Sequence, residues 1–314
     1  MNVLNKISIY ISIMRLDHWF KNIFVLPGIF LAIYFYSVSI SIDLLYRVVF
    51  GLLLICITSS ANYTINEYLD SDTDKSHPIK SARPGARGLL EGKYVLIQYA
   101  TLSIISLYFA SMIGLEFLLL ILLFLFMALL YNVKPARLKD TVYVDVLIES
   151  FNNPLRLLLG WYLVSEVTEM PPSSLLLSYW MGGTFLMTVK RLAEYRMIND
   201  EIKAALYRKS FSVYTETKLI ISSFFYGITS SLFLGIFLIK YKIELILVFP
   251  MIAALFSWYL YIGLSDNKTA VYPEKLYTEK ELLLILGIFI GSTLILLNID
   301  IPFMNILLKR HFLS

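Results

Sequence analysis

The feature that most constrains this chain is a series of apolar segments, each long enough to cross a lipid bilayer. Crossing the hydrocarbon core takes about 20 apolar residues in a helix, and nine segments approach that length. They are residues 23–41, 47–69, 94–113, 115–131, 142–164, 174–190, 217–239, 243–264 and 281–299. Only 16% of the residues are charged and 58% are hydrophobic, whereas a soluble protein carries about 25% charged residues. The sequence therefore predicts an all-α, polytopic membrane protein with nine transmembrane helices.

The charges outside these segments predict how the helices are oriented. If the N-terminus is cytoplasmic, the connections on that side hold most of the 27 lysines and arginines, as the positive-inside rule requires. Before the first segment, Ile7, Ile11 and Met14 recur at helical spacing, which is typical of a short amphipathic helix on the membrane surface. We therefore expect a single domain, with a surface helix over 1–21 and a nine-helix bundle over 22–300.

The second apolar segment runs into a stretch that is dense in charge. Within it, Asn66, Asp70 and Asp74 are spaced four residues apart, and on a helix each such step turns only about 40°, so the three side chains share one face. Two carboxylates one turn apart repel each other unless a cation lies between them. Mg²⁺ suits that place, because it binds one or two carboxylates and completes its octahedron with water and substrate phosphates. Asp72 points to the other side of the helix, and we expect it to be solvated.

Cations follow these acidic residues directly. His77, Lys80 and Arg83 lie just beyond Asp74, and such side chains bind phosphate oxygens. A metal ion and a phosphorylated substrate are therefore indicated together. The alternative is a solvated loop of mixed charge, which is the usual reason for a run of charges.

A second polar stripe enters the fifth apolar segment. On a helical wheel, Asp145, Glu149, Asn152 and Arg156 fall within about 60° of one another, and Pro154 should bend the helix. Ionisable residues at membrane depth cost about 2.5–3.5 kcal/mol each on insertion scales, and they usually mark function. The alternative is structural, since Glu149 and Arg156 lie about two helical turns apart and would neutralise one another.

Two further charged segments have both functional and structural interpretations. Lys190 and Arg191 end the sixth apolar segment and lie a helical turn before Glu194, so they serve either phosphate binding or local helix pairing. The basic and aromatic residues from there to Lys218 are typical of a surface helix on anionic lipid. At the start of the first apolar segment, Trp19 lies between Arg15 and Lys21 and is either a membrane anchor or part of a site.

These motifs, in their order along residues 1–195, resemble those of the UbiA superfamily of intramembrane prenyltransferases. The N-x-x-x-D-x-x-x-D that starts at Asn66, followed by a second acidic motif on another helix, carries the resemblance. The remaining motifs are similar to the decaprenyl-phosphate phosphoribosyltransferase branch of that family. They are R-x-x-x-W-x-K-N from Arg15, H-P-x-K-x-x-R-P from His77, the tyrosine and L-K-x-x-x-x-x-D-V between Tyr131 and Val146, Arg156, and K-R-x-A-E from Lys190.

The resemblance implies a transferase whose helices surround a cavity near the cytoplasmic face, with Mg²⁺ bridging the acidic motifs and the diphosphate of a donor. The branch implies 5-phosphoribosyl 1-diphosphate as donor and a polyprenyl phosphate lipid as acceptor, and no nucleic-acid partner is expected. The expected catalytic and metal-binding residues are Asp70, Asp74 and Asp145. The expected substrate-binding residues are Lys21, Asn66, His77, Lys80, Arg83, Tyr131, Lys139, Glu149, Arg156, Lys190 and Arg191.

Two other functions stay open on these motifs. A prenyltransferase would use the same Mg²⁺ site to move an isoprenoid from its diphosphate to an aromatic or other small acceptor. A transporter or lipid-binding protein would use the polar stripe as a permeation path and would not depend on Mg²⁺. For either enzyme the expected location is the bacterial inner membrane, with the N-terminus and the active-site loops in the cytoplasm.

Overall fold

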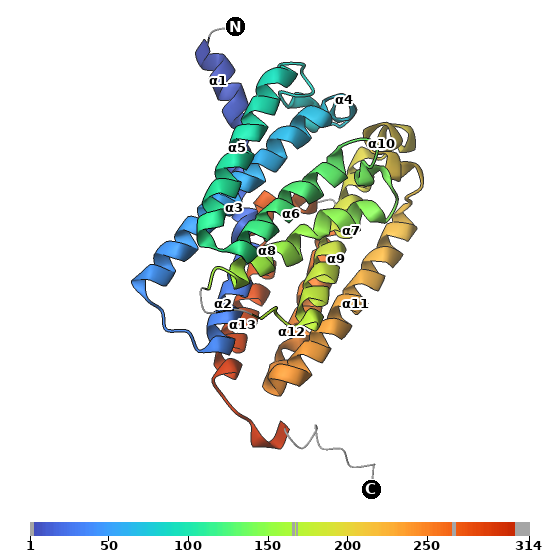
Figure 1. Cartoon of the computed structure of the whole chain (residues 1–314). Helices are drawn as coiled ribbons and strands as arrows, with labels where there is room; N and C mark the ends of the chain where they lie inside the picture. Colours follow the sequence, from blue (N-terminus) through green and yellow to red (C-terminus); the bar gives the residue numbers. More distant parts are fainter. Residues whose placement is uncertain (1–2, 165–166, 168, 266–267, 305–314) are drawn as a thin grey trace. The chain divides into compact units, whose positions relative to one another are not determined.

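The computed structural model describes residues 3–164, 167, 169–265 and 268–304, which form α-helices joined by short 3-10 helices (Figure 1). The predicted all-α fold is confirmed for these residues. The chain divides into two compact units. The first comprises Met1–Pro171 and Ile198–Glu216, and the second comprises Pro172–Met197 and Thr217–Ser314.

The first unit holds both acidic motifs. Its helices are α1 (Val3–Ser12), η1 (Leu16–Val25), α2 (Leu26–Tyr36), α3 (Ile42–Leu69), α4 (Ser71–Asp74), η2 (Lys80–Ala82), α5 (Gly92–Ile113), α6 (Leu115–Asn132), η3 (Leu138–Asp140), α7 (Val144–Ser150), α8 (Asn152–Trp161), α10 (Glu201–Tyr207) and η4 (Lys209–Ser212). Local signals explain where some of them begin. Ser41 caps α3 by accepting the N–H of Leu44 at 3.1 Å, and Pro27 lies in the first turn of α2, where its missing N–H is not needed.

The second unit is built from longer helices. They are α9 (Ser173–Ile198), α11 (Glu216–Tyr241), η5 (Ile243–Val248), α12 (Phe249–Leu264), η6 (Lys268–Val271), η7 (Pro273–Thr278) and α13 (Lys280–Leu297). Within this unit α12 packs against α13. The hydroxyl of Ser230 on α11 donates to the carbonyl of Ser178 on α9 at 2.9 Å, so a polar contact joins these two helices.

Seven helical stretches in the described part of the chain are long and apolar enough to cross a membrane. They are Asn5–Tyr36, Ile42–Leu69, Gly92–Ile113, Leu115–Asn132, Glu216–Tyr241, Ile243–Leu264 and Lys280–Leu297. The two other predicted spans are more polar. Residues 142–164 form α7 and α8, which meet at Phe151 because Pro154 interrupts the helix, and residues 174–190 lie in α9, which carries serine, glycine and threonine. The count of nine therefore stays a prediction.

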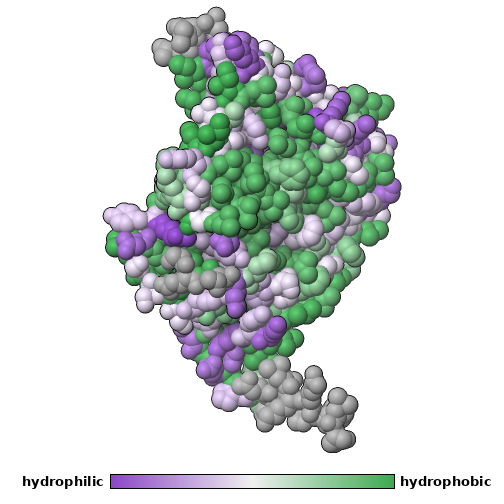
Figure 2. All heavy atoms as spheres, in the orientation of Figure 1, coloured by the Kyte–Doolittle hydropathy of each residue, from purple (hydrophilic) through white to green (hydrophobic). Residues whose placement is uncertain are grey.

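Large hydrophobic side chains cover the outside of the apolar helices. On α5, for example, Leu96, Ile104 and Met112 are each more than half exposed. Figure 2 shows a broad field of hydrophobic side chains, in green, on the visible face. Contiguous apolar surface of this extent is typical of a protein that contacts lipid.

Two glycines bring α2 and α8 into contact. A Cβ atom on Gly28 would lie 2.0 Å from the carbonyl oxygen of Leu157, and one on Gly160 would lie 2.1 Å from that of Val25. The main chains of the two helices therefore touch, a packing that small residues permit in membrane proteins. This contact is part of the buried core of the first unit, to which α3, α5 and α6 also contribute.

We expect Gly160→Ala to destabilise the protein by about 1–3 kcal/mol, because the added methyl group would force α2 and α8 apart. Gly235→Ala on α11 is the matched control, since no atom lies within 4 Å of a Cβ at that position and alanine favours helix. Thermal unfolding in the same detergent compares the two variants. A Gly160→Ala protein as stable as the unchanged chain would contradict the main-chain contact.

Candidate active site

The first acidic motif keeps its helical spacing across the end of α3. The N–H of Asp70 donates to the carbonyl of Asn66, and the N–H of Asp74 donates to that of Asp70, both at 2.9 Å. The side-chain amide of Asn66 also donates to Asp70 Oδ2 at 3.0 Å. The helical path that the spacing predicts is therefore present. The prediction for Asp72 is confirmed, because its side chain is 90% exposed.

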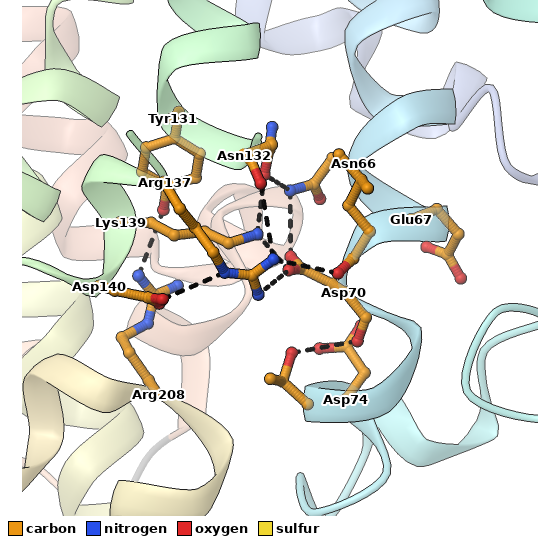
Figure 3. A network of polar contacts seen from close by, with 12 residues as sticks. Asn66, Glu67, Asp70, Asp74, Tyr131, Asn132, Arg137, Lys139, Asp140 and Arg208 are labelled. Atoms are coloured by element: carbon orange, nitrogen blue, oxygen red, sulfur yellow. Dashed lines mark hydrogen bonds and ion pairs between the residues drawn. The ribbon is translucent and has the colours of Figure 1, made fainter. Parts of the chain in front are cut away.

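Asp70 is held by the loop that follows α6 (Figure 3). Its Oδ1 contacts the ammonium group of Lys139 and lies 3.4 Å from Arg137 Nη2. Asn132, at the end of α6, accepts hydrogen bonds from both Lys139 and Asn66, at 2.8 and 2.7 Å. Burial disfavours the charged carboxylate, but the surrounding cations, Lys139 foremost, outweigh it and hold the pKa of Asp70 below its ordinary value. Asp70 is therefore ionised at neutral pH.

Asp74 is almost completely buried and pairs with a cation of its own loop. Only 3% of the residue is exposed, and Arg83 Nη1 lies 2.7 Å from its Oδ2. Burial raises the pKa of Asp74 in spite of the opposing charges of Arg83 and Lys80. Asp74 therefore takes up a proton at a higher pH than an ordinary aspartate does.

Two other predicted residues of this loop, His77 and Lys80, contact Tyr207 at the end of α10. The ring centroids of His77 and Tyr207 lie 4.5 Å apart, and the ammonium group of Lys80 contacts the Tyr207 hydroxyl. His77 Nδ1 accepts the backbone N–H groups of Ile79 and Lys80, both at 3.1 Å, which fixes the direction of the ring. The structure thus brings His77 and Lys80 together and adds an aromatic residue to which the sequence pattern assigned no role in the site.

The second acidic motif lies on α7 and is held by hydroxyl groups. Asp145 accepts a hydrogen bond from Tyr214 at 2.7 Å and another from Ser210 at 3.2 Å. Tyr131 on α6 donates to Glu149 Oε2 at 2.8 Å. The predicted residues Tyr131 and Glu149 are therefore in contact. The role of Asp145 as a metal ligand stays a prediction.

The segment after α10 corrects one interpretation of the sequence. The pattern of basic and aromatic residues predicts a surface helix on lipid, but Tyr207, Ser210, Phe211 and Tyr214 are each at most 5% exposed. Tyr207 packs on His77 and Lys80 in the loop after the first motif, and Ser210 and Tyr214 donate hydrogen bonds to Asp145 on α7. The spacing of the three aromatic residues, i, i+4 and i+7, is the signal that could have found this buried face.

A further polar cluster joins η1, α3 and α8. Arg156 Nε donates to Asn22 Oδ1 at 3.0 Å, and the indole N–H of Trp19 donates to the hydroxyl of a serine on α3 at 2.9 Å. Lys21 lies in the same η1 helix, with its Nζ 3.1 Å from a ring nitrogen of His18. The Trp19 side chain therefore makes a hydrogen bond within the helix bundle, and membrane anchoring alone does not describe it. Substrate binding by Lys21 and Arg156 stays a prediction.

Lys190 and Arg191 belong to the second unit, on α9. Arg191 Nη1 lies 2.9 Å from Glu194 Oε2, and both side chains are buried. This contact is the local pair that the spacing of three residues allows. The contact favours the interpretation that Arg191 pairs with another side chain on its own helix. Phosphate binding by Lys190 and Arg191 stays a prediction.

Glu67 forms a buried ion pair to which the sequence pattern assigned no role. It is 2% exposed, it contacts the guanidinium group of Arg15, and its Oε1 accepts the N–H of Gly85 at 3.3 Å. Gly85 lies so close to α3 that a Cβ there would come within 2.6 Å of the Glu67 carbonyl oxygen. Glu67 therefore ties the chain before η1 and the loop after Asp74 to the end of α3.

The donor set of Asp70 and Asp74 fits Mg²⁺ in its chemistry. Both groups are carboxylates, which are the hard oxygen donors that this ion prefers, and they lie one helical turn apart. In the described residues, no group of three or more His, Cys, Asp or Glu side chains is placed to hold a metal ion. An ion that is held by two protein carboxylates usually fills its remaining positions with water and phosphate oxygens.

Comparison with known proteins decides the family. Residues 24–292 match the UbiA prenyltransferase family. This chain belongs to the UbiA family. As a UbiA protein it is a transferase, and the seven apolar stretches found in the described part of the chain agree with an integral membrane protein. The resemblance found in its sequence motifs is thereby confirmed.

Relatives with named functions point to one branch of the UbiA family. The decaprenyl-phosphate phosphoribosyltransferase of Mycobacterium tuberculosis (strain CDC 1551 / Oshkosh) is 28% identical over 221 residues, which cover 68% of this chain and 68% of that protein. The protein of the same name from Mycolicibacterium smegmatis is 26% identical over 221 residues, which cover 68% of this chain and 65% of that protein.

Solved structures share the UbiA fold at lower identity. A UbiA homologue from Archaeoglobus fulgidus bound to GPP and Mg²⁺ has a TM-score of 0.66 at 18% identity, over 93% of this chain and 100% of that chain. The same homologue bound to DMAPP and Mg²⁺ has a TM-score of 0.67 at 20% identity, over 93% and 99% of the two chains. At this level of identity the likeness shows the fold.

We expect Glu67→Gln to destabilise the protein by about 3–5 kcal/mol, because Arg15 would keep a buried charge without its partner. Lys75→Met is the control. This substitution breaks the ion pair between Lys75 Nζ and Asp72 Oδ1, which lie 2.7 Å apart. That pair is exposed and should contribute at most about 1 kcal/mol to the free energy of unfolding. Thermal unfolding in detergent measures both variants, and two equally small changes would contradict a structural role for Glu67.

Proposed function

We propose that this chain transfers a 5-phosphoribosyl group from phosphoribosyl diphosphate to a polyprenyl phosphate. The observation that carries the proposal is the set of cations around the first acidic motif, where Lys139 and Arg137 approach Asp70 and Arg83 approaches Asp74. A donor with a diphosphate and a further phosphate group can use more cations than an isoprenoid diphosphate can. The names of the mycobacterial relatives support the same choice.

In this proposal the cations of the site exchange carboxylate partners for phosphate oxygens when the donor binds. Hydrogen bonds between charged groups are the stronger ones, and the planar guanidinium groups of Arg83 and Arg137 match two phosphate oxygens at once. Asp70 and Asp74 would hold Mg²⁺, which when bound neutralises charge on the leaving diphosphate. Lys139 would then bind the donor from the side of α6.

The proposed reaction exchanges one carbon–oxygen bond for another. The bond between C1 of the ribose and the diphosphate oxygen breaks, and its electron pair leaves with the diphosphate. A bond forms between C1, which is oxocarbenium-like at that point, and an oxygen of the acceptor phosphate. Because the acceptor phosphate is already an anion at neutral pH, the reaction needs no general base. The task of the protein is then to orient two anions and to stabilise the developing charge.

A second function is favoured by the solved structures. UbiA homologues bound to GPP or DMAPP with Mg²⁺ share the fold of this chain. On that basis the alternative is transfer of an isoprenoid from its diphosphate to an aromatic or other small acceptor. Asp70 and Asp74 would have the same role in both reactions, which differ in the part of the donor that enters the product.

The proposal also states which membrane holds the protein and which side of that membrane its loops face. We place the protein in a bacterial inner membrane, with the N-terminus and the loops that carry Asp74 and Lys139 in the cytoplasm. The mycobacterial origin of the relatives supports the membrane, and the excess of lysine and arginine in the loops on that side supports the orientation.

Purified protein in detergent with Mg²⁺ is expected to move label from phosphoribosyl diphosphate into lipid when a polyprenyl phosphate is present. A parallel reaction supplies a labelled isoprenoid diphosphate and an aromatic acceptor. Organic extraction followed by thin-layer chromatography shows which label enters the lipid product. Transfer from the isoprenoid donor alone would contradict the proposal and support the alternative.

Asp70→Asn and Asp74→Asn are each expected to lower kcat by about 100-fold or more, because each removes a carboxylate charge that would hold the metal ion. Asp72→Asn makes the same chemical change in the same loop on an exposed side chain, and its rate should stay unchanged. Initial rates over a series of Mg²⁺ concentrations measure the effect. Full activity in the Asp70 and Asp74 variants would argue for a function that does not need the metal.

A further inference from the structure

The residues Tyr207–Tyr214, which we name the strap, contact both acidic motifs. They form the end of α10 and all of η4. At its first residue, Tyr207, the strap meets Lys80 in the loop of the first motif. At Ser210 and Tyr214 it meets the second motif. The strap therefore links two parts of the site that lie far apart in the sequence.

Asp145 binds the strap with both of its carboxylate oxygens. The residue is fully buried, Oδ1 accepts a hydrogen bond from Tyr214 at 2.7 Å, and Oδ2 accepts one from Ser210 at 3.2 Å. The hydroxyl oxygen of Tyr214 also accepts the backbone N–H of Tyr143 at 2.8 Å. Since that N–H occupies one side of the oxygen, the hydroxyl proton of Tyr214 points at Asp145. Each carboxylate oxygen of Asp145 is thus engaged by a hydroxyl group of the strap.

Arg208 is the cation that the strap brings into the site. Its guanidinium group lies 3.7 Å from Asp145 Oδ2, and its Nη1 donates to the hydroxyl oxygen of Tyr131 at 3.2 Å. Figure 3 shows Arg208 reaching towards Tyr131, beside Arg137 and its partner Asp140. The ring centroid of Tyr131 in turn lies 5.7 Å from the ammonium group of Lys139, which is the cation that contacts Asp70. Arg208 is thus connected to the Asp70 network, although it comes from a different segment.

We propose that Asp145 is a positioning residue, which holds the strap and thereby places Arg208 as a phosphate-binding cation beside Asp70. The inference rests on the proposed function in one respect, because it requires a donor that carries phosphate groups. It gives Asp145 a different role from the metal binding that the sequence pattern predicts. Arg208 is an additional site residue, beyond those that the sequence motifs indicate.

The build of the strap supports this role for Asp145. α10 has 7 residues and η4 has 4, and helices this short are not stable by themselves in water. Their position therefore depends on side-chain contacts, of which the two hydrogen bonds to Asp145 are part. Asp145 also offsets the repulsion among Arg208, Arg137 and Lys139, which would otherwise act in a partly buried site.

Hydrogen–deuterium exchange of the ligand-free protein in detergent tests the anchoring. We expect Asp145→Asn to raise amide exchange over residues 201–216 by about 10-fold or more. The double variant Ser210→Ala/Tyr214→Phe removes the same hydrogen bonds from the other side and should have the same effect, even if Asp145→Asn fails to fold. Ser212→Ala is the matched control, because that hydroxyl is exposed and donates within its own turn.

Transfer kinetics test what the strap does for the donor. Arg208→Met should raise the KM for the phosphorylated donor by about 10-fold or more, and Arg208→Lys should retain part of the affinity because the charge remains. Asp145→Asn should raise the same KM while the Mg²⁺ concentration for half-maximal rate stays within about 2-fold. Asp74→Asn should instead shift that Mg²⁺ concentration.

Two results would overturn the inference. Unchanged exchange over residues 201–216 in Asp145→Asn, together with a shifted Mg²⁺ dependence, would return Asp145 to the metal site. A strap that loosens without any rise in donor KM would remove Arg208 from phosphate binding. Failure of the proposed function would give a different result, because the unmodified protein would then transfer no label from phosphoribosyl diphosphate. The hydrogen–deuterium exchange comparison of the variants does not depend on the donor and would still hold. The KM values would then be measured with the isoprenoid diphosphate as donor.

Discussion

The neutralisation of Asp70 by the loop after α6 is the interaction on which the rest of the site depends. A carboxylate at the end of a membrane helix, away from water, is stable only where cations take the place of solvent. Lys139 and Arg137 provide that charge, and in doing so they fix the loop between α6 and α7 against the end of α3. Because the same loop leads directly into Asp145, one network of ion pairs sets the position of both acidic motifs.

The helices and the first acidic motif could be predicted from sequence because periodicity encodes them. α5 and α6 begin and end within a few residues of the apolar segments 94–113 and 115–131. The path from Asn66 to Asp74 follows from the spacing of four residues, since the backbone continues a helical hydrogen-bond pattern across Asp70. The break between α7 and α8 follows from Pro154, which cannot donate to the preceding turn.

The pairing of charges could not be predicted, because it depends on directions in space that periodicity does not record. The helical wheel places Glu149 and Arg156 on one stripe, but it does not show that Tyr131 donates to Glu149 or that Arg156 donates to Asn22. The strap is the larger case. Its basic and aromatic composition fits a membrane surface equally well. The spacing of Tyr207, Phe211 and Tyr214 marks one apolar face, but the sequence does not say whether lipid or the rest of the site covers that face.

The glycine contact between α2 and α8 has a consequence for lipid traffic. Where two main chains touch, as they do at Gly28 and Gly160, the seam leaves no gap through which an acyl or isoprenoid tail could slide. A tail therefore cannot pass between α2 and α8 at the level of these two glycines. Bulky side chains placed in turn at the other helix seams of the first unit would test whether a hydrophobic ligand passes through any of them.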